Sequence, residues 1–182
     1  MSPSDPNTLP SPLPGAPPPP RVATLTISDT RTAADDRGGP ELRRLLAAAG
    51  FPLGAHAIVS DGVDSVRGAV KALCADPAID VVVTTGGTGI SPRDRTYEAI
   101  EGLLDRRLDG FGEAFRRLSW DDVGPRAILS RALAGTVGAK IVVALPGSPR
   151  ALALAVERIL APLLPHAVAV ANGRGSHRGD HR

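Results

Sequence analysis

The chain has 182 residues and a formal net charge of only +2, with 21 basic residues mixed among 19 acidic ones. Aromatic residues make up 3% of it, so neither a basic stripe nor stacking platforms favour nucleic acid as a partner. The single cysteine, Cys74, excludes an intrachain disulfide and a cysteine-based zinc site. No stretch approaches the roughly 20 apolar residues needed to span a bilayer, so we expect a cytoplasmic protein without a membrane partner.

The two ends of the chain differ in composition from the middle. Residues 1–20 contain nine of the 18 prolines and almost no large apolar side chains, which predicts a disordered, proline-rich arm. The glycine-rich residues 172–182 predict a flexible tail. Between them, residues 21–171 have the length of one domain with one core.

The middle of the chain alternates between strand and helix patterns. In chain order the predicted elements are strand 22–27, helix 40–49, strand 57–59, helix 63–75, strand 81–85, a helix from 96 to 103, helix 111–118, strand 140–144 and helix 149–161. This alternation predicts an α/β fold, a three-layer α/β/α sandwich around a mostly parallel, doubly wound sheet. In such sheets ligands bind beyond the carboxyl ends of the strands.

A glycine-rich loop follows the third predicted strand. Gly86, Gly87 and Gly89 lack Cβ atoms, so the backbone there can adopt positive φ and approach a ligand closely. Thr85 and Thr88 add hydroxyl donors. The loop is suited to hold a phosphate, but glycines also serve a tight strand-to-helix connection, and the glycines alone favour neither interpretation.

Charged residues at the end of this loop favour the phosphate interpretation. Arg93 can neutralise oxyanions, and Asp94 can hold a divalent metal that bridges them. Thr96 is expected to be the N-cap of the following helix. The loop has neither the GK[ST] ending of a Walker loop nor the GxGxxG spacing of a dinucleotide fingerprint, so a P-loop NTPase and a Rossmann dehydrogenase are both excluded.

The string TTGGTGISPRDRTYEAI, residues 84–100, resembles the GGTG…RD.T.EA signature of the MoaB/Mog family of molybdenum cofactor biosynthesis proteins. Three further stretches follow the order of the family: SDT at 28–30, ILSRALAG at 128–135 and ALPGSPRAL at 144–152. Residues 110–124 look more like the MoaB branch than the MogA branch. Tyr97 departs from the proline that is usual after the threonine of this signature, and Ala144 stands where some relatives carry asparagine.

The resemblance implies a molybdopterin adenylyltransferase, which transfers AMP from ATP to molybdopterin and releases pyrophosphate. A phosphate nucleophile is already anionic, so the chemistry needs positioning and charge neutralisation rather than an activated side chain. Asp61 and Asp94 match the positions of two aspartates needed for activity in the family, and the resemblance implies that they are catalytic and hold Mg²⁺. Without the resemblance, Asp61 could equally be a turn residue or a helix cap.

The resemblance also implies which residues bind the nucleotide, its phosphates and the pterin: Ser28, Asp29, Thr85, Gly86, Gly87, Thr88, Gly89, Arg93, Thr96, Ser130, Pro146, Gly147 and Ser148. Several have ordinary alternatives, since Ser130 could be a small helix residue and Gly147 and Ser148 could form a simple turn.

The resemblance further implies self-association as a trimer or hexamer, and a possible partner of the MoeA metal-insertion type. Two other functions compete with adenylyl transfer. One is a molybdopterin-binding protein without catalysis, and the retention of both aspartates argues against it. The other is a nucleotide amidohydrolase related to the competence-damage proteins, but those read GGLGPT.DD where this chain has GGTGISPRD.

Overall fold

The computed structural model describes residues 18–29 and 35–174. The predicted arm, up to residue 17, and the tail from residue 175 therefore lie outside the described residues. Pro20 is buried, so the packed domain begins before Arg21, where we had expected the arm to end.

The sheet has six strands in the order β2-β1-β3-β6-β5-β4. Neighbours among β2, β1, β3 and β6 pair in parallel, whereas β5 pairs antiparallel with both β6 and β4. The sheet is thus mostly parallel, as predicted. The strands are β1 (Val22–Ile27), β2 (Leu53–Val59), β3 (Val81–Thr85), β4 (Arg106–Arg107), β5 (Leu133–Val137) and β6 (Lys140–Leu145).

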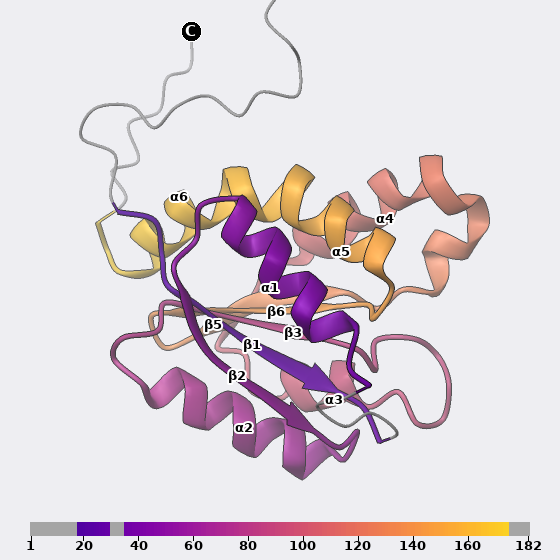
Figure 1. Cartoon of the computed structure of the whole chain (residues 1–182), viewed down its shortest axis with the longest axis horizontal. Coiled ribbons are helices and arrows are strands. Elements are labelled where there is room, and N and C mark those ends of the chain that lie inside the picture. Colours follow the sequence, from indigo (N-terminus) through magenta and orange to yellow (C-terminus); the bar gives the residue numbers. More distant parts are fainter. Residues whose placement is uncertain (1–17, 30–34, 175–182) are drawn as a thin grey trace, which may run out of the picture.

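Helices cover both faces of the sheet (Figure 1). One apolar cluster joins the sheet to α1, α4 and the C-terminal helix, and a second joins it to α2 and α3. The neighbouring β3 residues Val81 and Val82 belong to opposite clusters because side chains alternate across a strand. The three-layer α/β/α prediction is confirmed. The helical elements are α1 (Gly38–Ala48), α2 (Val63–Ala75), α3 (Thr96–Glu101), α4 (Asp109–Val123), the 3₁₀ helix η1 (Gly124–Leu129), α5 (Pro149–Ala155), the π-helical turn η2 (Val156–Leu160) and α6 (Ala161–Ala171).

Two strands, β4 and β5, were not predicted. The sequence of β5, LAGTV, is short and has alanine and glycine at its centre, which weaken the strand signal of the β-branched Thr136 and Val137. A Cβ atom on Gly135 would lie 2.4 Å from the Arg106 carbonyl oxygen. Glycine at this position therefore allows β4 to approach β5 closely. The need for it becomes visible only in the paired strands and not in the sequence.

The C-terminal helix is longer than predicted, because α5, η2 and α6 form one continuous helix from Pro149 to Ala171. By length and composition alone, this one helix of the described chain could cross a membrane, with a mean hydropathy of 1.5. Our expectation that no stretch was apolar enough was therefore wrong. Leu152, Leu160 and Leu164 are fully buried in the core cluster of the sheet, although only 28% of the apolar window of this helix is buried.

The parallel strands place several loops at one edge of the sheet. Ser28 follows β1, Asp61 follows β2, Gly86 follows β3 and Gly147 follows β6. Because parallel strands share a direction, their carboxyl ends meet at this edge. The loops that carry most of the predicted site residues are thereby brought together.

Candidate functional site

A cavity of about 310 Å³ opens at the carboxyl edge of the sheet. Loops after four different strands contribute to it, and it includes nine of the predicted site residues: Ser28, Asp29, Asp61, Thr85, Gly86, Gly87, Arg93, Asp94 and Gly147. The convergence of these loops is what a doubly wound sheet provides for ligand binding.

The glycine turn after β3 has a backbone that only glycine adopts easily. Gly86 has φ +106° and Gly87 has φ +63°. A Cβ atom on Gly86 would lie 2.3 Å from the carbonyl oxygen of Ile27, and one on Gly87 would lie 2.2 Å from Thr96 Oγ1. The fold therefore requires both glycines for its own geometry, and the same turn also lines the cavity.

Thr96 supports this turn and does not cap the helix as we had predicted. Helix α3 begins at Thr96 and follows Arg95, which makes no side-chain capping bond. The Thr96 hydroxyl donates to the Gly86 carbonyl at 2.9 Å, and its backbone N–H donates to the Gly87 carbonyl at 3.1 Å. Thr96 is fully buried, so water cannot satisfy the Gly86 and Gly87 carbonyl groups next to it, and Thr96 supplies a donor to each.

Asp29 and Asp61 are joined by two reciprocal hydrogen bonds, each from the backbone N–H of one residue to the carboxylate of the other. The Asp29 N–H donates to Asp61 Oδ2 at 3.2 Å, and the Asp61 N–H donates to Asp29 Oδ1 at 2.9 Å. The other carboxylate oxygen, Asp61 Oδ1, is buried and has no hydrogen-bond partner among the described residues. A buried carboxylate oxygen is normally satisfied by a hydrogen-bond donor or a cation, so Asp61 Oδ1 can accept a metal ion, a ligand donor or a water.

The charge state of Asp61 reflects this environment. Burial raises the pKa of its carboxyl group, and the charge of Asp29 raises the pKa further, with a smaller contribution from Asp94. The charge of Arg93 acts in the opposite direction. The cavity thus brings carboxylates close enough to repel each other, an arrangement that a bound cation would relieve.

Asp94 is held by a short turn in the glycine-rich loop. Its Oδ2 atom accepts from the Ser91 N–H at 2.8 Å, and its own N–H donates to the Ser91 carbonyl at 2.8 Å. These bonds orient the carboxylate beside Arg93 at the cavity. Ser91, which also lines the cavity, was not identified from the sequence.

The donor set fits Mg²⁺ that is shared with phosphate groups. Within the described ranges, no group of three or more His, Cys, Asp or Glu side chains could hold a metal by itself. Mg²⁺, however, is commonly held by one or two carboxylates, with phosphate oxygens and waters completing the octahedron. Asp61, with its unpartnered oxygen, and Asp94 would supply those carboxylates.

We expect Asp61→Asn to raise the melting temperature at pH 7. The folded-state pKa of Asp61 is raised, so the ionised carboxylate destabilises the folded state and the protonated carboxyl group does not. Asp61 therefore lowers stability little below its unfolded pKa of about 3.9, and lowers it fully once the pH has risen through the folded pKa. Asparagine removes the charge and keeps an oxygen for the Asp29 N–H. The gain should be present at pH 7 and nearly absent at pH 3.5 in thermal unfolding.

The control for this variant is Asp121→Asn, because Asp121 is an exposed carboxylate on α4. It should shift the melting temperature little at either pH. Adding Mg²⁺ should raise the melting temperature of the wild-type protein more than that of Asp61→Asn. A lower melting temperature for Asp61→Asn at pH 7 would contradict the assigned charge environment.

Three of the predicted binding residues lie beside this cavity and not in it. Ser130, Pro146 and Ser148 line a neighbouring cavity of about 190 Å³. Ser148 is the N-cap of α5, since its hydroxyl accepts from the Ala151 N–H at 3.3 Å. Because Gly147 lines the first cavity, the turn at 146–148 separates the two spaces.

Thr88 and Gly89 line neither cavity. Their carbonyl groups accept hydrogen bonds from Arg131, which was not singled out from the sequence although it lies in the ILSRALAG stretch. Asp36 was also missed. Its carboxylate accepts from the hydroxyl of Thr26, a cavity residue, at 2.6 Å and from backbone N–H groups that start α1. A buried carboxylate of this kind leaves no local signal in the sequence.

Comparison with known proteins places the chain in a family. Residues 23–166 match the family described as "Probable molybdopterin binding domain". Molybdenum cofactor biosynthesis protein B of Bacillus cereus is 46% identical over 147 residues, which cover 80% of this chain and 87% of that protein. The chain belongs to the MoaB/Mog family.

Solved structures of MoaB/Mog proteins share the fold. A crystal structure of a molybdenum cofactor biosynthesis protein B has a TM-score of 0.83 at 43% identity, covering 87% of this chain and 99% of that one. The tungsten cofactor synthesizing protein MoaB of Pyrococcus furiosus has a TM-score of 0.71 at 33% identity, covering 86% and 99%. The predicted resemblance and fold class are confirmed.

Proposed function

We propose that this MoaB/Mog protein acts in molybdenum cofactor biosynthesis by transferring AMP from ATP to the terminal phosphate of molybdopterin. The unpartnered buried oxygen of Asp61 carries the proposal, because it shares one cavity with Asp94, Arg93 and the glycine turn. The strand ends thus combine two carboxylates that can hold a metal ion with an arginine that can bind phosphates.

In the proposed reaction, a phosphate oxygen of molybdopterin attacks the α-phosphorus of ATP. A new P–O bond forms, the bond to the β-phosphate oxygen breaks, and pyrophosphate leaves with the electron pair. The Gly87 backbone and the Arg93 guanidinium would bind phosphate oxygens and neutralise their charge. Asp61 and Asp94 would hold Mg²⁺, which when bound supplies further charge neutralisation on the phosphates. Asp29 would keep Asp61 in place through their reciprocal hydrogen bonds.

The two neighbouring cavities suggest how the substrates are divided. ATP phosphates would occupy the cavity of the glycine turn, and the pterin would lie beside Ser130 and Ser148. The turn that contains Gly147 lies between them, where the phosphate of molybdopterin would meet the nucleotide. Holding the two reactants next to each other in this way would accelerate adenylyl transfer through proximity and orientation.

The test combines the purified protein with Mg-ATP and molybdopterin, and measures adenylyl-molybdopterin and pyrophosphate. An α,β-methylene analogue of ATP should bind without product, because the bond to be broken is replaced. Removing Mg²⁺ with a chelator should stop the reaction. Tight binding of molybdopterin with no product under any of these conditions would instead establish a pterin-binding protein without catalysis.

We also propose self-association, for which an exposed apolar surface is the support. Trp120 and Val123 on α4 and Ile128 and Leu129 on η1 are between 45% and 65% exposed. Large apolar side chains gathered on neighbouring elements are typical of a protein interface. Sedimentation analysis should show a trimer or hexamer, and a monomer would contradict this part of the proposal.

A further inference from the structure

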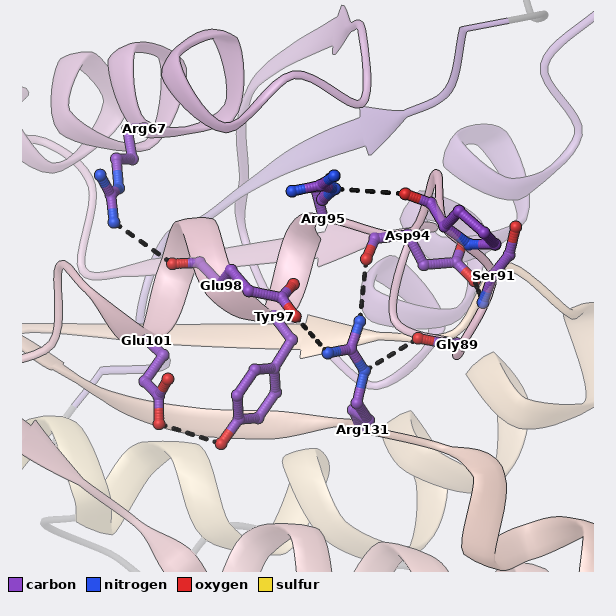
Figure 2. A network of polar contacts seen from close by, with 10 residues as sticks. Arg67, Gly89, Ser91, Asp94, Arg95, Tyr97, Glu98, Glu101 and Arg131 are labelled. Carbon is purple, nitrogen blue, oxygen red and sulfur yellow. Dashed lines mark hydrogen bonds and ion pairs between the residues drawn. The ribbon is translucent and has the colours of Figure 1, made fainter.

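Arg131 contacts the start of the glycine-rich loop, the end of the loop and the helix that follows it (Figure 2). Its backbone N–H donates to the Thr88 carbonyl at 2.9 Å. In its side chain, Nε donates to the Gly89 carbonyl and Nη2 to the Asp94 carbonyl, each at 2.8 Å. Nη1 forms an ion pair with Glu98 on α3. One residue therefore holds both ends of the segment from 88 to 94.

The guanidinium of Arg131 is itself held in place. It lies over the Tyr97 ring, 5.1 Å from the ring centre, and its side chain is 28% exposed. The hydrogen bond from Arg131 lowers the pKa of Glu98, so this carboxylate remains charged. A planar guanidinium with several fixed donors can satisfy such a set of acceptors, whereas the single ammonium group of lysine cannot reach all of them.

The segment that Arg131 holds has little apolar support of its own. Residues 90–93 are exposed, and Ile90 has 67% of its surface accessible. Apolar burial therefore does not fix this part of the loop, so its conformation depends on hydrogen bonds. Those between Ser91 and Asp94 form the turn itself, and those from Arg131 hold its two ends. Arg93 and Asp94, which line the cavity, lie at the end of this segment.

We propose that Arg131 is a positioning residue, which holds Arg93 and Asp94 in the geometry that adenylyl transfer requires without contacting the substrates. The catalytic part of this inference rests on the proposed function. The clamp itself, the set of contacts from Arg131 to Thr88, Gly89, Asp94 and Glu98, can be tested without turnover.

The test uses Arg131→Lys and Arg131→Gln, with Arg67→Gln as the matched control. Arg67 also donates from its side chain to two backbone carbonyls, those of Ala99 and Glu98. Figure 2 shows its bond to Glu98, away from the loop that Arg131 contacts. Hydrogen exchange of the Ser91 and Asp94 amides should accelerate by at least about tenfold in both Arg131 variants. Arg67→Gln should leave these amides unchanged.

Activity provides the second measurement, expressed per folded protein. In both Arg131 variants, kcat should fall by about 100-fold, because displacement of catalytic groups by about 1 Å has an effect of that size. Molybdopterin affinity should change less than kcat. A simple loss of stability would lower the folded fraction and leave kcat of the folded protein unaltered.

The outcomes separate the clamp from the proposed reaction. Unchanged loop exchange in both Arg131 variants, restoration of exchange and kcat by lysine, or an equal effect of Arg67→Gln would each overturn the clamp. If the wild-type protein forms no adenylylated product, the proposed function is wrong, and so is the role of Arg131 in positioning residues for that reaction. In that case the exchange data still decide whether Arg131 orders the loop.

Discussion

Gly87→Val is expected to lose most of its affinity for Mg-ATP and for molybdopterin's phosphate. Gly87 has φ +63°, and a Cβ atom there would lie 2.2 Å from Thr96 Oγ1 and 3.0 Å from Asp61 Oδ1. The backbone strain alone should cost about 1–3 kcal/mol. Relieving these clashes must displace the glycine turn or the Asp61 carboxylate, and both belong to the cavity. Titration of each ligand against the folded variant measures the effect.

The control for this variant is Gly68→Val. Gly68 is exposed on α2, has no atom within 4 Å of a Cβ position and does not require positive φ. Any change in its stability reports helix propensity alone, in which valine is slightly better than glycine. Gly86 is a less useful target, because a Cβ there would strike the backbone oxygen of Ile27 and would test folding more than binding. Near-normal affinities in Gly87→Val would show that the turn is only a connection.

Asp94→Asn is expected to reduce adenylyl transfer by about 10²- to 10³-fold, the effect of removing one electrostatic contact to the transition state. The asparagine oxygen can still accept from the Ser91 N–H, so the loop should keep its conformation. Molybdopterin binding should be largely kept, since Ser130 and Ser148 line the other cavity. Steady-state kinetics and pterin titration measure the two effects.

Asp94→Ala separates charge from loop structure. It removes the charge and also the acceptor for the Ser91 N–H, so it should abolish activity and accelerate hydrogen exchange at Ser91. The fold should survive, because Asp94 lies at the cavity edge and outside both apolar clusters. Turnover of either Asp94 variant at the wild-type rate would refute the catalytic assignment.

Local patterns in the sequence determined much of the fold. The bounds of β1, α2 and β3 agree with those predicted, because a run of β-branched residues and the helical period of apolar residues are local signals. The glycine-rich loop and the aspartates that follow strands were also recognisable, since parallel strands bring their carboxyl ends to one edge. The family was recognisable because each of its motifs is a short run of neighbouring residues, and the comparisons confirmed it.

Only the tertiary structure decided the features that depend on distant contacts. β5 is a strand because it pairs antiparallel with β6 and β4, since the alanine and glycine at its centre carry little strand preference of their own. Thr96 donates to the glycine turn ten residues earlier, and Arg131 reaches the loop across 37 to 42 residues. The separation of Ser130 and Ser148 from the aspartates likewise follows from packing. Such contacts leave no periodic pattern, because their energy depends on which buried groups the completed fold brings together.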